Sequence, residues 1–159
     1  MNGAVLTISD GVHHGTREDR SGDTLAELLE ADGFAVERRI VPDEREQIAA
    51  ALRQLAQSAR LVLSTGGTGL APRDVTPEAT RDVLDREAPG IAQALRADSI
   101  RKTPHGLLTR GVAGVAGSAL VVNLPGSTGG CRDGYAVLRP ALEHALRLLA
   151  DEATVHEQT

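Results

Sequence analysis

Short apolar runs alternate along this chain with segments in which apolar residues recur at helical spacing. The runs 5–9, 34–41 and 61–65 have the length and the β-branched content of single strands. A helical pattern follows each of them, directly or after a loop, and parallel strands need such crossover helices because a tight turn cannot join them. The alternation therefore predicts an α/β protein with three layers, α/β/α, around a mostly parallel sheet.

Start and stop signals place the helices. Ser21 or Asp23 is expected to cap the first helix, which Gly33 ends, and Thr76, followed by Pro77, is expected to cap another. Further helices are expected over 44–58, 90–102 and 138–149. The runs 107–115 and 118–124 flank Ala116-Gly117 and predict a late β-hairpin, which adds one antiparallel strand to the sheet.

Length and composition are those of one globular domain, expected over residues 1–159. The chain is 41% hydrophobic and 25% charged. At this length it can bury a full core without a disulfide or a structural metal. Cys131 is its single cysteine, which excludes an internal disulfide and a cysteine-rich zinc site. We expect Cys131 to be a small buried or half-buried residue, because no neighbouring residue marks it as a nucleophile.

Charge, aromatic content and the length of the apolar runs argue against two classes of partner, nucleic acids and membranes. A net charge of -5 and 1% aromatic residues leave neither the basic field nor the stacking platforms of nucleic-acid binders. No apolar run approaches the ~20 residues that span a bilayer. We therefore expect a cytoplasmic protein without nucleic-acid or membrane partners, in which local donors or a metal ion hold any anionic ligand.

The carboxyl ends of the expected strands carry the candidate site, because ligands of open α/β sheets bind outside those ends. They include Gly66-Gly67-Thr68-Gly69, which joins the strand 61–65 to the loop before the Thr76 helix. Glycines let backbone N–H groups approach a phosphate closely, although a plain tight turn is the alternative. The loop lacks the Gly-Lys-Ser/Thr of a Walker A motif and the third glycine of a dinucleotide fingerprint.

Two acidic residues accompany this loop. Asp74 follows the glycines and Asp43 ends the strand 34–41. Two carboxylates beside a phosphate site suit Mg²⁺, which takes oxygen ligands. The alternatives are local: Asp74 as a turn or capping residue and Asp43 as a helix cap. The turn 123–130 is a second anion candidate, with a plain strand-to-helix connection as its alternative.

These motifs, in order, closely resemble the MogA/MoaB family of molybdenum-cofactor biosynthesis over about residues 3 to 150. The resemblance rests on five stretches, 7–10, 41–44, 65–69, 73–79 and 123–127. It implies a molybdopterin-binding domain that assembles as a homotrimer. It also implies a molybdopterin adenylyltransferase, which uses Mg²⁺ and ATP to place AMP on the terminal phosphate of molybdopterin and releases pyrophosphate.

The same resemblance implies the roles of single residues. Asp43 and Asp74 match the family's catalytic, metal-binding acids. Ser99 and Thr109 lie in a stretch that resembles its molybdopterin contacts, with Thr109 where Ser is commoner. The remaining matches are the phosphate loop and other pocket positions: Gly66, Gly67, Thr68, Gly69, Asp10, Asn123, Pro125, Gly126 and Ser127. The sequence departs from the family pattern a second time after this turn, where residues 128–131 replace the usual Pro and a basic residue.

A non-catalytic molybdopterin-binding or scaffold protein of the same fold is the alternative function. Retention of both Asp43 and Asp74 favours the enzyme, because a binder has no need to hold a metal against a triphosphate. An inactive MoaB-type relative would still keep most of these residues. For an active enzyme, hand-over of the product to a molybdate-insertion protein is the expected next contact.

Overall fold

The computed structural model describes residues 1–156; residues 157–159, the end of the expected domain, lie outside the described part. The strands are β1 (Asn2–Ile8), β2 (Ala35–Val41), β3 (Leu61–Thr65), β4 (Arg86–Glu87), β5 (Ala113–Ala116) and β6 (Ala119–Leu124). The helices are α1 (Asp10–His13), α2 (Arg20–Ala31), α3 (Arg45–Ser58), α4 (Thr76–Arg81), α5 (Pro89–Lys102), the 3-10 helix η1 (Pro104–Leu108) and α6 (Thr128–His156).

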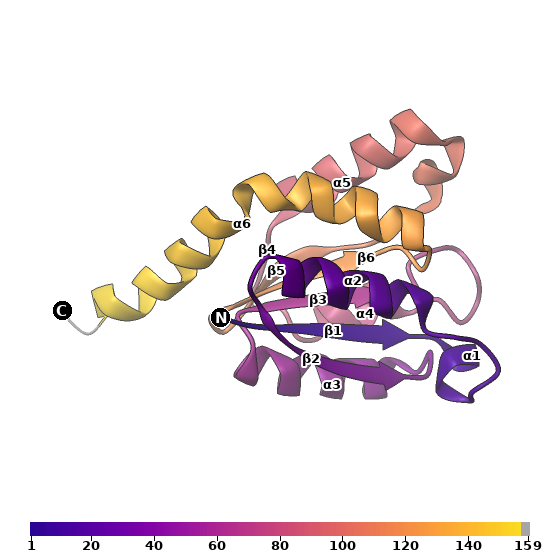
Figure 1. The fold of residues 1–159 in the computed structure, drawn as a ribbon, viewed down its shortest axis with the longest axis horizontal. Coiled ribbons are helices and arrows are strands. Elements are labelled where there is room, and N and C mark those ends of the chain that lie inside the picture. The colour runs from indigo at the N-terminus through magenta and orange to yellow at the C-terminus, as the bar shows by residue number, and fades with distance from the viewer. Residues whose placement is uncertain (157–159) are drawn as a thin grey trace.

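The six strands form one mixed sheet in the order β2-β1-β3-β6-β5-β4 (Figure 1). β2, β1, β3 and β6 run parallel, and β5 is antiparallel to both of its neighbours. The predicted mostly parallel sheet with one antiparallel strand from a late hairpin is therefore confirmed. The carboxyl ends of β1, β3 and β6 lie side by side, because Thr7 pairs with Thr65 and Thr65 with Leu124.

Helices cover both faces of this sheet, as the three-layer prediction requires. On one face, α2, α5 and α6 pack over β1, β3 and β6, with Val5, Leu29 and Leu63 in the core. On the other face, α3 and α4 enclose a second core around Leu6 and Leu52. Successive residues of β1 enter opposite cores, because side chains alternate between the two faces of a strand. The two cores fix the strand ends relative to one another.

Two predicted caps are wrong. Asp19 caps α2 in place of Ser21 or Asp23, since its carboxylate accepts the N–H of Gly22 at 3.1 Å and also the hydroxyl of Thr7 at 2.9 Å. Thr76 is the first residue inside α4, and its hydroxyl donates to the carbonyl of Gly66 at 2.9 Å. At both helices a contact with a distant part of the chain, which local sequence does not reveal, decides how the helix begins.

Two element boundaries also differ from the sequence-based expectation, and two short elements are additional. The run 107–115 is a strand only from Ala113, because its first part belongs to η1 and to a connecting stretch. The predicted terminal helix over 138–149 begins ten residues earlier, at Thr128. The short elements α1 and β4 were not predicted at all. No helix in the described part is long and apolar enough to cross a membrane.

Candidate functional site

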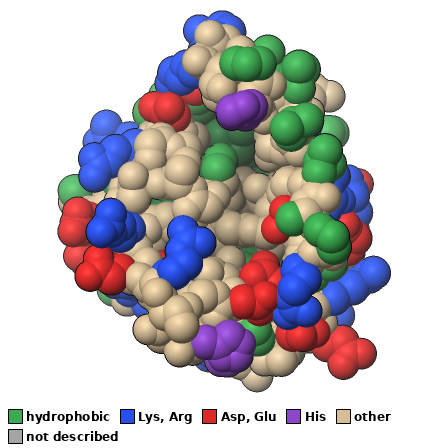
Figure 2. All heavy atoms as spheres, turned by 90° about the vertical axis from the view of Figure 1, so that its right-hand side faces the viewer, with side chains coloured by type: hydrophobic (Ala, Val, Ile, Leu, Met, Phe, Trp, Pro, Cys, Tyr) green, Lys and Arg blue, Asp and Glu red, His purple; other side chains and the backbone are tan. Residues whose placement is uncertain are grey.

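Two cavities open at the carboxyl end of the parallel strands, on the hollowed face that Figure 2 shows. The first, here called the carboxylate cavity, has a volume of about 620 Å³ and is lined by Asp43, Asp74, Gly66 and Gly67 among others. The second, here called the α5 cavity, has a volume of about 600 Å³ and runs along α5 and η1. The two cavities are neighbours, because Ser127 lines both of them.

The structure divides the predicted site residues between these cavities. The carboxylate cavity receives Asp43, Asp74, Gly66, Gly67, Gly126 and Ser127. The α5 cavity receives Thr68, Gly69, Ser99, Thr109, Asn123, Pro125 and again Ser127. The loop 66–69 therefore forms part of the wall of both cavities. Asp10 is the one predicted site residue that lines neither of them.

Asp43 is held by a reciprocal pair of hydrogen bonds with Asp10. The N–H of Asp10 donates to Asp43 Oδ2 at 2.9 Å, and the N–H of Asp43 donates to Asp10 Oδ1 at 3.0 Å. The pairing joins the ends of β1 and β2 and rejects the capping alternative, since Glu44 is the N-cap of α3. Burial, together with the charges of Asp10 and Asp74, raises the pKa of Asp43.

Arg73 fixes Asp10 from the other side. Its Nε and Nη2 donate to the two carboxylate oxygens of Asp10 at 2.6 and 3.1 Å, and Nη2 also donates to Glu44 at 3.0 Å. The hydrogen bonds from Arg73 lower the pKa of Asp10 from 3.8 to about 2. Arg73 is therefore committed within the protein, and Asp10 acts as the support of Asp43.

Asp74 makes a local turn without capping a helix. Its Oδ2 accepts the N–H of Ala71 at 3.0 Å, whereas the N-cap of α4 is Val75. The turn alternative is thus partly present. It occupies one carboxylate oxygen and leaves Oδ1 without a hydrogen-bond partner among the described residues.

The donor set of the carboxylate cavity fits a Mg²⁺ ion. Asp43 Oδ1 and Asp74 Oδ1 each lack a hydrogen-bond partner in the described part of the chain. A Cβ placed on Gly67 would lie 3.2 Å from Asp43 Oδ1, so the glycine keeps the backbone close to this carboxylate. No described group of three or more His, Cys, Asp or Glu could hold a metal. Mg²⁺ needs fewer protein ligands, because it binds through one or two carboxylates plus phosphate and water oxygens.

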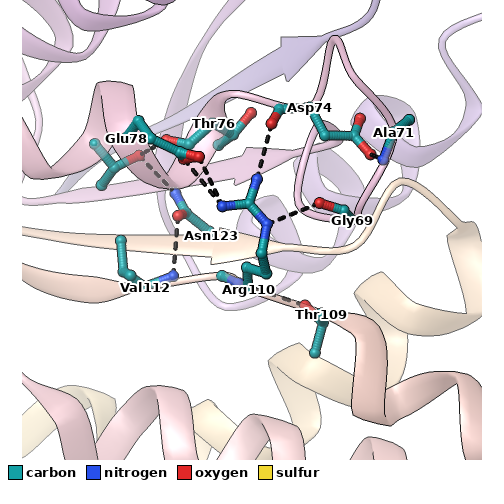
Figure 3. A network of polar contacts seen from close by, with 11 residues as sticks. Gly69, Ala71, Asp74, Thr76, Glu78, Thr109, Arg110, Val112 and Asn123 are labelled. Carbon is teal, nitrogen blue, oxygen red and sulfur yellow. Dashed lines mark hydrogen bonds and ion pairs between the residues drawn. The ribbon is translucent and has the colours of Figure 1, made fainter.

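Arg110 ties the loop 66–74 to the rest of the site (Figure 3). Its guanidinium donates to the carbonyls of Gly69 and Asp74 at 2.9 and 2.8 Å, and to Glu78 at 2.6 Å. Its own N–H donates to the carbonyl of Thr68 at 2.8 Å. The side chain of Arg110 thereby fixes both ends of the segment 69–74, which begins at Gly69 and ends at Asp74.

The wall of the α5 cavity combines apolar side chains, such as Leu95 and Val112, with polar and charged groups, many of them from α5. Arg96 holds the segment before β5 against this wall, because its guanidinium donates to the carbonyls of Thr109 and Gly111 at 3.2 and 3.1 Å. Asn123 is 4% exposed, and its amide is used inside the protein. Its Oδ1 accepts from Val112 N–H, and its Nδ2 donates to Ser64 and Thr80. Asn123 therefore supports the wall by internal bonds.

Sequence reasoning did not single out Arg110 or Arg17 as site residues. Arg17 lines the carboxylate cavity from the loop between α1 and α2. That loop follows β1 at the carboxyl end of the sheet, where ligands of open α/β sheets bind, so its position could have marked it as part of the site. Arg110 belongs with Thr109 to a stretch that resembles the family's molybdopterin contacts, but only the fold brings its guanidinium to the glycine loop. Cys131 is buried as predicted.

Comparison with known proteins places this arrangement in a family. A model described as a probable molybdopterin binding domain matches residues 4–144. The Drosophila melanogaster protein "Molybdenum cofactor synthesis protein cinnamon" is 40% identical over 160 residues, which cover 98% of this chain but 26% of cinnamon. The "Molybdopterin adenylyltransferase" of Helicobacter pylori strain J99 is 35% identical over 150 residues, 91% of this chain and 85% of that protein.

Solved structures agree with the sequence comparison. The molybdopterin biosynthesis enzyme MoaB from Thermus thermophilus matches with a TM-score of 0.85 and 45% identity, over 93% of this chain and 95% of that one. Several curated relatives are more than twice as long as the part that they share with this chain. The domain match in sequence and the likeness in fold agree, and the chain belongs to the MogA/MoaB family of molybdenum cofactor biosynthesis.

Proposed function

We propose that this protein is a molybdopterin adenylyltransferase, which transfers AMP from ATP to the phosphate of molybdopterin and releases pyrophosphate. One observation carries the proposal. Two carboxylates, each with an uncommitted oxygen, line a cavity together with Gly66 and Gly67, and that cavity adjoins a second one through Ser127. A reaction between two bound substrates needs such a pair of adjoining sites.

The two substrates are assigned by the chemistry of the walls. Molybdopterin suits the α5 cavity, because Leu95 and Val112 offer apolar surface to a pterin ring, and Ser99 and Thr109 belong to the stretch that resembles the family's molybdopterin contacts. The nucleotide suits the carboxylate cavity with its glycine loop. The phosphate of molybdopterin would then meet the α-phosphorus of ATP beside Ser127.

The reaction needs positioning and charge neutralisation more than proton transfer. An oxygen of the molybdopterin phosphate attacks the α-phosphorus, the bond from that phosphorus to the β-phosphate oxygen breaks, and pyrophosphate leaves with the electron pair. The attacking oxygen is already anionic, so no strong general base is required. Asp43 and Asp74 would hold Mg²⁺, which when bound neutralises phosphate charge. Backbone N–H groups of residues 67–69 would face the phosphates, since the N–H of Gly66 already donates to the carbonyl of Leu124 at 3.2 Å. Asp10 and Arg110 keep the acids in place.

A non-catalytic molybdopterin-binding protein of the same fold is the second candidate. Such a protein needs only the α5 cavity. The carboxylate cavity favours the enzyme, because burial and neighbouring acids make Asp43 costly to ionise, and a bound cation offsets that cost.

Incubation of the protein with molybdopterin, ATP and Mg²⁺ tests the proposal. Adenylylated molybdopterin and an equal amount of pyrophosphate are the expected products, both absent when Mg²⁺ is chelated. Tight binding of molybdopterin without any product would favour the non-catalytic candidate.

Two further parts of the proposal rest on the family resemblance alone. We propose that the protein assembles as a homotrimer and passes its product to a molybdate-insertion protein. We also propose that it works in the cytoplasm, as its composition leads us to expect. We propose neither a nucleic-acid nor a membrane partner, in keeping with the acidic charge of the chain.

A further inference from the structure

The loop between α1 and α2 brings two arginines to the carboxylate cavity. Arg17 and Arg20 line it together with Asp43 and Asp74. The cavity therefore has basic as well as acidic side chains in its wall, which a site for a metal ion alone does not need.

The backbone at Arg17 is fixed by the carbonyl of Gly11, at the start of α1. That oxygen accepts the N–H of Thr16 at 2.9 Å, the hydroxyl of Thr16 at 3.1 Å and the N–H of Arg17 at 3.2 Å. The stem of Arg17 then lies over Gly11, where an added Cβ would be 2.7 Å from Arg17 Cδ. The glycine makes room for the arginine, and the turn sets the direction of its side chain.

The charge of Arg17 is uncommitted. Its guanidinium has no ion pair or hydrogen bond within the described residues. Arg20 differs, because its Nε donates to Glu18 at 3.3 Å. Arg73, close to the same acids, is bound to Asp10 and Glu44. Arg17 is thus the cation of this cavity that has no partner in the described part of the protein.

We infer that Arg17 binds the pyrophosphate end of the nucleotide, an inference that rests on the proposed function. A triphosphate carries about four negative charges, and a divalent cation at Asp43 and Asp74 offsets only part of them. A guanidinium offers paired N–H donors that match two phosphate oxygens. When the bond between the α-phosphorus and the bridging oxygen breaks, negative charge accumulates on the departing pyrophosphate, and Arg17 stabilises that charge.

Binding of inorganic pyrophosphate, measured by calorimetry in the presence of Mg²⁺, tests this inference without requiring turnover. Arg17→Ala is expected to weaken pyrophosphate binding about tenfold or more, because a charge-assisted pair is lost. Arg17→Lys keeps the charge and recovers part of the affinity. Arg147→Ala is the matched control, because this exposed arginine of α6 lines no described cavity and its removal should leave binding unchanged.

Kinetics separate this inference from the proposed function. Arg17→Ala is expected to raise KM for ATP and to weaken inhibition by pyrophosphate, with molybdopterin binding unaltered. Unchanged pyrophosphate affinity in Arg17→Ala, or no pyrophosphate binding by the wild type, would overturn the inference even in an active enzyme. A wild type that makes no adenylylated product, while Arg17→Ala still loses pyrophosphate, would instead reject the proposed function and retain the anion site.

Discussion

Single residues in this site divide into groups that face the cavities and groups that hold them there. Asp43 lines the carboxylate cavity, whereas Asp10 does not. The backbone N–H of each residue donates a hydrogen bond to the carboxylate of the other. Asp10 in turn depends on Arg73. The sequence gives no means of telling the two roles apart, because Asp10 and Asp43 each follow the end of a strand.

The ion pair of Asp10 predicts a pH-dependent stability. Its pKa in the folded protein is about 2, below the ordinary 3.8. The stabilisation is therefore fully present above pH 3.8 and is lost as the pH falls towards 2. Asp10→Asn keeps an oxygen that can accept from Asp43 but loses the charge. Its urea midpoint should lie below that of the wild type at pH 7, and the difference should shrink between about pH 4 and 2. A difference that is constant over this range would contradict the assignment.

Arg110 predicts a loss of stability together with a loss of activity. Arg110→Ala leaves the carbonyls of Gly69 and Asp74 without their donor, and we expect the free energy of unfolding to fall by about 1–3 kcal/mol. Arg20→Ala, which removes only an exposed ion pair, should change it by about 0.5 kcal/mol or less. Chemical denaturation measures both, and equal midpoints for the two variants would reject the role of Arg110.

At the scale of elements, the glycine loop depends on close backbone approach. Gly66 has φ +103°, and a Cβ there would lie 2.2 Å from the carbonyl oxygen of Ile8. Gly66→Ala should therefore displace the loop from β1, lower stability by at least about 1–3 kcal/mol and abolish nucleotide binding. Gly129→Ala is the control, because a Cβ there meets no atom within 4 Å and alanine favours the helix. Thermal unfolding that is alike in the two variants would contradict this account.

Most of the elements followed from apolar periodicity, and three of the exceptions share one physical cause, which is tertiary contact. The early start of α6 was missed because Gly129-Gly130 resembles a turn. A Cβ on Gly130 would lie 2.9 Å from Pro125, and one on Gly134 would lie 2.7 Å from Leu124. These glycines allow the helix to approach the end of β6, so they mark tertiary contact instead of chain reversal. Asp19 and Thr76 differ from expectation for the same reason, since both bond to distant strands or loops.

At the scale of the whole molecule, strand-end position predicted where the candidate site residues gather, but not that two cavities share them. Strand ends predicted that Asp43, Asp74 and the loop 66–69 would converge, and they lie at one end of the sheet. That the loop separates two cavities depends on η1 and α5, whose placement the sequence pattern does not determine. The far end of α6 extends away from the sheet in Figure 1.

The proposed homotrimer is a prediction of the family resemblance. Light scattering at micromolar concentration should give a mass three times that of the chain, independent of concentration over a tenfold range. Asp74→Asn should give the same mass, because Asp74 lies in a cavity of the single chain. A mass equal to that of one chain would remove the trimer from the account, without affecting the assignment of the cavities.

The exchange Asp74→Asn tests the central claim most directly. Asparagine keeps the shape of the side chain and an oxygen for the bond from Ala71, but it removes the charge that would hold a cation. With saturating ATP and Mg²⁺, adenylyl transfer should fall about a hundredfold or more, while molybdopterin binding to the α5 cavity remains within about twofold. A rate within a few-fold of the wild type would show that Asp74 only forms a turn, and would contradict the catalytic role of the carboxylate cavity.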